Sequence, residues 1–168
     1  MTMSEVPGIM EKVEEAVRPL TEHGDFYLTN ITHDGYYGDL KVLLTSKEFN
    51  ITFHTLLKAP KVFSCSFIVN SVNKHFSAEF LFPACHIDIP LRKERPLTDI
   101  DYSVLRDRYN NREKENEILL ERSRFIPEIS RLSNQIKKIL PLLDDLFMSP
   151  NIDKTWDLYI AESRKKQG

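Results

Sequence analysis

The stretch DFYLTNITHDGYYGDLKVLLT, residues 25–45, has the pattern of two strands joined by a tight turn. Aromatic, β-branched and polar residues alternate over residues 25–33, as they do in a half-buried strand. Asp34-Gly35 follows and is a strong hairpin signal, because glycine adopts the positive φ that such turns require. Residues 39–45 form the expected return strand. Strict alternation in the first strand separates two sets of residues: Phe26, Leu28 and Asn30 on one face, and Tyr27, Thr29 and Ile31 on the other.

Further strand-like segments follow this hairpin. KVFSCSFIV (61–69) and HFSAEFLF (75–82) place apolar residues at every second position, which predicts two strands joined by a polar loop at 70–74. In the second strand one face is expected to carry Phe76, Ala78, Phe80 and Phe82.

Residues 46–58 have two interpretations. Thr45 and Glu48 have the spacing of a capping box, and Phe49 and Phe53 lie at helical spacing. The run NITFHT within the segment is nevertheless strand-like. We favour the strand, because a meander of neighbouring strands is the simpler topology.

Helices are expected before and after this sheet region in the sequence. Residues 5–20 show helical spacing of apolar residues, with Ser4 as a possible cap and Gly24 closing the segment. Residues 98–165 are expected to be helical as well. Within them an apolar seam recurs at alternating steps of four and three, with Pro127 suiting a helix start and Pro141 expected to kink or break the helix. The seam consists of Phe125, Ile129, Leu132, Ile136, Ile139, Leu143 and Leu146.

These patterns together predict an α+β fold in a single domain, residues 1–168. An antiparallel sheet of four or five strands, within residues 25–83, would be covered on one face by the N-terminal helix and part of the C-terminal helical region. The segment from Tyr102 to Leu120 has few apolar residues, so we expect it to project from the domain or to be held by a partner chain.

Composition narrows the classes of function. The chain has 168 residues, 41% of them hydrophobic and 29% charged, and a formal net charge of -2, which gives no reason to expect a polyanion as its main partner. No apolar run is long enough for a membrane span, and the N-terminus lacks the pattern of a signal peptide. We therefore expect a cytoplasmic protein, with the nucleus not excluded, whose Cys65 and Cys85 are free thiols rather than a disulfide.

The candidate catalytic and metal-binding residues are few. Cys85, His86 and Asp88 lie close together, but a structural zinc site needs four ligands and no second ligand pair is present. His33 lies beside Asp34-Gly35, and the turn explains these residues without a catalytic role. We expect no catalytic residues, metal or cofactor. The alternative is a small enzyme or ligand-binding domain that uses His33, His86 or Asp88.

A second alternative is binding of nucleic acid by the basic region 92–124. Its glutamates, interleaved with the basic residues, favour instead a helix with intrahelical ion pairs. The basic residues concerned are Arg92, Lys93, Arg95, Arg106, Arg108 and Arg112.

The favoured function is non-catalytic binding of a protein partner, as a subunit, adaptor, chaperone or inhibitor in a homo- or hetero-oligomer. Binding would use the C-terminal helices, the sheet or both. The seam either packs on the chain's own sheet, which we favour, or pairs with another chain, and in both cases we expect Leu132, Ile136 and Ile139 to be buried. The candidate interaction residues are Tyr102, Tyr109, Leu132, Ile136, Ile139, Leu143 and Trp156.

Overall fold

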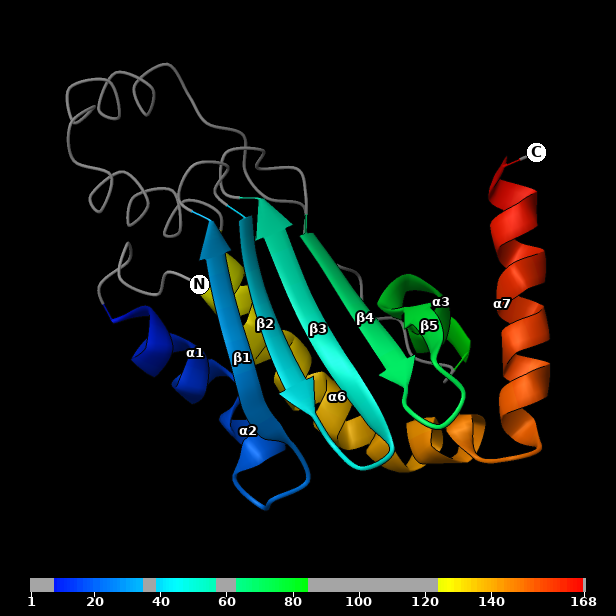
Figure 1. Cartoon of the computed structure of the whole chain (residues 1–168), viewed down its shortest axis with the longest axis horizontal. Helices are drawn as coiled ribbons and strands as arrows, with labels where there is room; N and C mark the ends of the chain where they lie inside the picture. The colour runs from blue at the N-terminus through cyan, green and yellow to red at the C-terminus, as the bar shows by residue number, and fades with distance from the viewer. Residues whose placement is uncertain (1–7, 35–38, 57–62, 85–123, 168) are drawn as a thin grey trace.

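The computed structural model describes residues 8–34, 39–56, 63–84 and 124–167. Its strands form one antiparallel sheet of five, in the order β1-β2-β3-β4-β5. In Figure 1, α6 lies behind this sheet, α1 and α2 lie beside it near β1, and α3 and α7 lie at its β5 edge. This α+β arrangement confirms the predicted fold class. The elements are α1 (Ile9–Ala16), α2 (Arg18–Thr21), β1 (Tyr27–Asp34), β2 (Asp39–Thr45), β3 (Phe49–Leu56), β4 (Phe63–Val69), β5 (Lys74–Ser77), α3 (Ala78–Ala84), α6 (Phe125–Phe147) and α7 (Asn151–Gln167).

β1 and β2 pair antiparallel as predicted, as far as Asp34 with Asp39, and the rest of the predicted Asp34-Gly35 turn lies outside the described residues. The pairing of β1 contains an irregularity. Leu28 pairs with Leu44, and the next pair is Asn30 with Leu43, so Thr29 is an extra residue without a partner in the register. Such a β-bulge reverses the alternation beyond it. Ile31 is therefore only 2% exposed, while Asn30 is exposed. The prediction that Asn30 shares the face of Phe26 and Leu28 is wrong for this reason.

The ambiguous segment 46–58 contains strand β3, which confirms the favoured interpretation. The turn before it is closed by Ser46, whose Oγ accepts a hydrogen bond from the Phe49 backbone N at 3.2 Å. Asn70 Nδ2 donates to the Ser46 carbonyl at 3.0 Å and links this turn to the loop between β4 and β5. That loop, at residues 70–73, lies where the sequence predicts it.

The predicted strand 75–82 is only half correct. β5 ends at Ser77, and residues 78–84 form helix α3. The Ser77 Oγ accepts a hydrogen bond from the Phe80 backbone N at 3.4 Å, as an N-cap does. Ala78, Leu81 and Phe82 are buried, which is helical rather than alternating spacing. Phe80 is thus only half-buried, although its ring still stacks on that of Phe76 with the centroids 6.3 Å apart.

The N-terminal helical segment is divided. α1 ends at Ala16 and α2 begins at Arg18, with Pro19 in the first turn of α2. Because proline lacks the N–H that a continuous helix would use here, the break falls just before it. The described part begins at Gly8, so Ser4 lies outside it. Gly24, with φ +79, ends the segment as predicted.

The C-terminal helices are longer and more continuous than the pattern indicates. α6 runs from Phe125 to Phe147 and passes through Pro141, so the helix does not end there. Six seam residues are buried and Leu146 is half-buried. α7 has 17 residues, more than the short final helix that was expected.

Phe147, at the end of α6, joins this helix to the inner face of the sheet. Its ring centroid lies 5.0 Å from that of Phe49, 6.5 Å from that of Phe67 and 5.5 Å from that of Phe76. These rings come from β3, β4 and β5. One aromatic cluster therefore holds the end of α6, and with it the start of α7, against the sheet.

Candidate functional site

Most residues singled out from the sequence lie outside the described ranges. His33 pairs with Leu40 in the β1–β2 register, and the structure does not describe its side chain. The roles predicted for the residues outside these ranges stay predictions. Those outside the described ranges are Cys85, His86, Asp88, Arg92, Lys93, Arg95, Tyr102, Arg106, Arg108, Tyr109 and Arg112.

The candidate interaction residues on α6 belong to the chain's own core. Leu132, Ile136, Ile139 and Leu143 are almost completely buried, as part of the same cluster as the inner face of the sheet. The burial expected for the first three is confirmed. Packing within one chain accounts for the seam, and a role for these residues in binding a partner stays untested.

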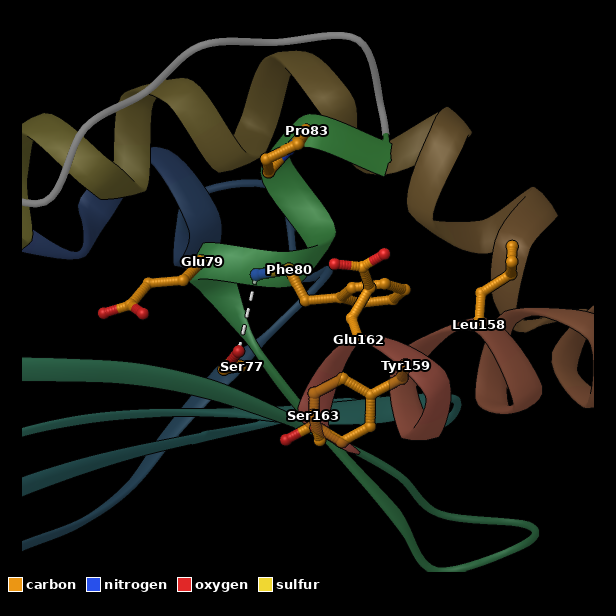
Figure 2. A pocket seen from close by; sticks show the side chains of 8 residues that line it. All are labelled: Ser77, Glu79, Phe80, Pro83, Leu158, Tyr159, Glu162 and Ser163. Atoms are coloured by element: carbon orange, nitrogen blue, oxygen red, sulfur yellow. Dashed lines mark hydrogen bonds between the residues drawn. The ribbon is translucent and has the colours of Figure 1, made fainter. Parts of the chain in front are cut away.

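The candidate site in the described part of the chain is a groove between α3 and α7. It encloses about 540 Å³, within the range of roughly 300–1,000 Å³ that ligand pockets span. Figure 2 shows α3 and the end of β5 on one side and α7 on the other. We call it the α3–α7 groove. It is lined by Ser77, Glu79, Phe80, Pro83, Leu158, Tyr159, Glu162 and Ser163.

The α3 wall follows from the cap at Ser77. Once the chain turns into a helix there, Ala78, Leu81 and Phe82 face the core, whereas Glu79 is exposed. Phe80 is therefore only half-buried, and its ring becomes part of the groove. The local change from strand to helix thus creates this side of the site.

The α7 wall is held at its base by hydrogen bonds to the end of α6. Thr155 Oγ1 lies 3.1 Å from the Leu146 carbonyl oxygen, and Asn151 Nδ2 donates to the Asp145 carbonyl at 2.9 Å. Ile152 is buried beside them. These contacts set the direction in which α7 leaves the core.

Aromatic contacts then position the middle of α7. The Tyr159 ring centroid lies 5.4 Å from that of Phe76 and 5.2 Å from that of Phe80. The Trp156 centroid lies 5.6 Å from that of Tyr159, and Lys74 Nζ lies 4.3 Å from the Trp156 ring centroid. Aromatic pairs at these separations contribute about 0.5–1.5 kcal/mol each beyond their buried area. The two walls are thus joined directly, by Phe80 and Tyr159.

The chemistry of the groove combines apolar surface with negative charge. Leu158 is 63% exposed, although it is a large hydrophobic residue. Glu162 points from α7 toward α3, whereas Glu79 points outward from the start of α3 (Figure 2). None of the described lining residues is Lys, Arg or His. The groove is therefore suited to an apolar group that carries, or lies beside, a positive charge.

An acid–base pair is present elsewhere, on the outer face of the sheet. His54 Nε2 contacts Asp39 Oδ1, and Ser64 pairs with His54 in the β3–β4 register. Catalysis by such groups needs a hydrogen bond to a reacting group and a site that excludes water. No hydrogen bond between Ser64 and His54 is present in the described part.

Cys65 and Asp144 have shifted pKa values. Burial, with a smaller contribution from Glu128, raises the pKa of the Cys65 thiol far above its usual range, which makes it an unreactive core residue. Partial burial, with repulsion from Glu48 and Asp25, raises the pKa of Asp144. Neither group lies in the α3–α7 groove. Within the described ranges, no group of three or more His, Cys, Asp or Glu side chains is placed to hold a metal ion.

Sequence reasoning missed nearly all of the groove. Trp156 is the candidate interaction residue that lies beside it, through its contact with Tyr159. The useful signal was present at residues 77–82, where Ser77 precedes apolar residues at helical as well as alternating spacing. A strand at these residues does not predict the half-buried position of Phe80 beside α7.

No helix in the described residues is long and apolar enough to cross a membrane. Comparisons with protein-family models, with curated proteins and with solved structures find no match to this chain.

Proposed function

We propose that this chain is a non-catalytic protein-binding module and that its α3–α7 groove holds a segment of a partner protein. The observation that carries this proposal is the exposed Leu158 in the same groove as the half-buried rings of Phe80 and Tyr159. Aromatic and aliphatic side chains in a concave site are typical anchors of protein recognition.

The construction of the groove also supports binding. Its walls are held by the Ser77 cap, by the hydrogen bonds of Thr155 and by ring contacts, so they are formed before a ligand arrives. A preformed site loses less conformational entropy on binding than one that must be ordered by its ligand. The preformed walls of the groove therefore support a role in recognition of a partner.

The proposal can be tested by selecting peptides from a random display library on the purified chain. The informative variant is Leu158→Asp, which places a carboxylate in the groove. Leu142→Asp is the matched control, because Leu142 is a 47% exposed leucine on α6 that does not line the groove. Both variants should fold normally, since substitutions at exposed positions usually change stability by within about 0.5 kcal/mol.

We expect selected peptides to bind the wild type and Leu142→Asp equally, and to bind Leu158→Asp at least about tenfold more weakly, a difference of about 1.4 kcal/mol. The proposal fails if no peptide is enriched, or if the enriched peptides bind both variants alike.

The finer expectations from the sequence stay proposals. These are a role as a subunit of a homo- or hetero-oligomer, and a cytoplasmic location. The alternative of nucleic-acid binding rests on residues 92–124, of which only Arg124 lies in a described range.

A further inference from the structure

We infer that the segment bound in the α3–α7 groove is basic and amphipathic, with Lys or Arg side chains next to an apolar anchor. This inference rests on the proposed function and names the chemical class of the partner. It follows from the arrangement of charge around an apolar floor.

The two carboxylates lie on opposite walls of the groove. Glu79 belongs to α3 and is exposed, and Glu162 belongs to α7, where its side chain is 52% exposed. An apolar side chain seated near Leu158 and Phe80 would leave neighbouring side chains of the same peptide close to these two groups. Complementary charge at such a rim favours a cationic peptide and disfavours an anionic one.

Two of the cations near the groove, Lys165 and Lys74, contact other groups. Lys165 Nζ lies 3.5 Å from Glu162 Oε1, and both side chains are more than half exposed, so this ion pair is weak. Lys74 is placed over the Trp156 ring. In the described residues no ion pair involves Glu79, which makes Glu79 the more available of the two carboxylates.

Trp156 supplies a direct measure of occupancy. It is the only tryptophan of the chain, and its ring contacts Tyr159, which lines the groove. A ligand beside Tyr159 should change the environment of the indole and therefore its emission. Binding can be followed with unlabelled protein and with peptides that contain no tryptophan.

The experiment uses three acetylated and amidated 12-residue peptides with leucines at the same positions. All remaining positions are Lys in the first peptide, Gln in the second and Glu in the third. Each is titrated into the full chain at low and at high salt while Trp156 emission is recorded. We expect the Lys peptide to bind about tenfold more tightly than the Glu peptide at low salt. The difference should shrink at high salt, because exposed charges are screened within about 3 Å at about 1 M.

Variants then assign the preference to individual groups. Glu79→Gln and Glu162→Gln should each weaken binding of the Lys peptide by about two- to fivefold, the range expected for one exposed ion pair. Neither variant should change the affinity for the Gln peptide. Glu14→Gln on α1 is the control for net charge and should have no effect. Lys165→Gln should strengthen binding of the Lys peptide by a similar factor, because it removes the ion pair of Glu162 with Lys165.

The outcomes separate this inference from the proposed function. If all three peptides bind alike and Leu158→Asp abolishes their binding, the groove is a binding site but the basic preference is wrong. If the Glu peptide binds best, or Glu14→Gln weakens binding as much as Glu79→Gln, the inference is overturned. If no peptide binds, both proposals fail. A dimer of the peptide-free chain that Leu158→Asp breaks would make a second copy the occupant, which also overturns the inference.

Discussion

Phe147→Ala should be among the most destabilising single changes in the described chain. Phe147 is 7% exposed, and truncating a buried phenylalanine to alanine usually reduces the free energy of unfolding by about 3–5 kcal/mol. Because domains of ordinary size are stable by only about 5–15 kcal/mol, such a loss would remove a substantial part of the free energy of unfolding.

Phe147→Leu separates the ring contacts from the apolar volume. Leucine fills most of the same space but loses the contacts with Phe49, Phe67 and Phe76. With pairs worth about 0.5–1.5 kcal/mol each and not fully additive, we expect a loss of about 1–2 kcal/mol. Since α7 begins shortly after Phe147, the emission of Trp156 in the folded variant should change as well.

The assay is urea unfolding followed by far-UV circular dichroism, with stability taken from the midpoint at constant slope. Met148→Ala is the neighbouring control, because Met148 is 60% exposed, and it should stay within about 0.5 kcal/mol of the wild type. If Phe147→Ala loses less than about 1 kcal/mol, or no more than Met148→Ala, the end of α6 is not packed on the sheet as described.

Three further predictions concern the core and its charges. Ile136→Asp should unfold the chain at every protein concentration, because it buries an unpaired charge, and a folded monomer of this variant would instead favour a seam between chains. Ile31→Asn should lower the melting temperature far more than Asn30→Val, since the bulge turns Ile31 inward; similar effects of the two changes would contradict the bulge. Asp144→Asn should raise the melting temperature at neutral pH, because the raised pKa means that folding disfavours the ionised carboxylate. Scans at decreasing pH should show this gain shrinking below the raised pKa and vanishing below the ordinary value of about 3.8, whereas a gain that persists there would point to another cause.

The sequence by itself determined the class of fold and most of its elements. Alternation in residues 39–45 and 63–69, and the heptad-like spacing from Phe125, are signals that depend only on which side chains must leave water. These features are repeated over several residues, so no single tertiary contact reverses them.

Tertiary structure decided two features that each begin at a single residue. The bulge at Thr29 and the change from strand to helix at Ser77 each alter the direction of all side chains that follow. The local pattern was compatible with both outcomes, because Phe76, Ala78, Phe80 and Phe82 satisfy alternation while Ala78, Leu81 and Phe82 satisfy helical spacing. Packing against the sheet selects the helix, and this leaves Phe80 half-buried at the edge of the core.

The α3–α7 groove is therefore a product of the tertiary structure. Its walls come from segments that are far apart in sequence, and they meet because the cluster around Phe147 sets where α7 begins. No local pattern encodes the meeting of Phe80 with Tyr159 or the presence of Glu79 and Glu162 on opposite walls. Such contacts between distant segments arise only when burial of the whole core orders the chain, which is why the sequence predicted the sheet and the helices but not the site between them.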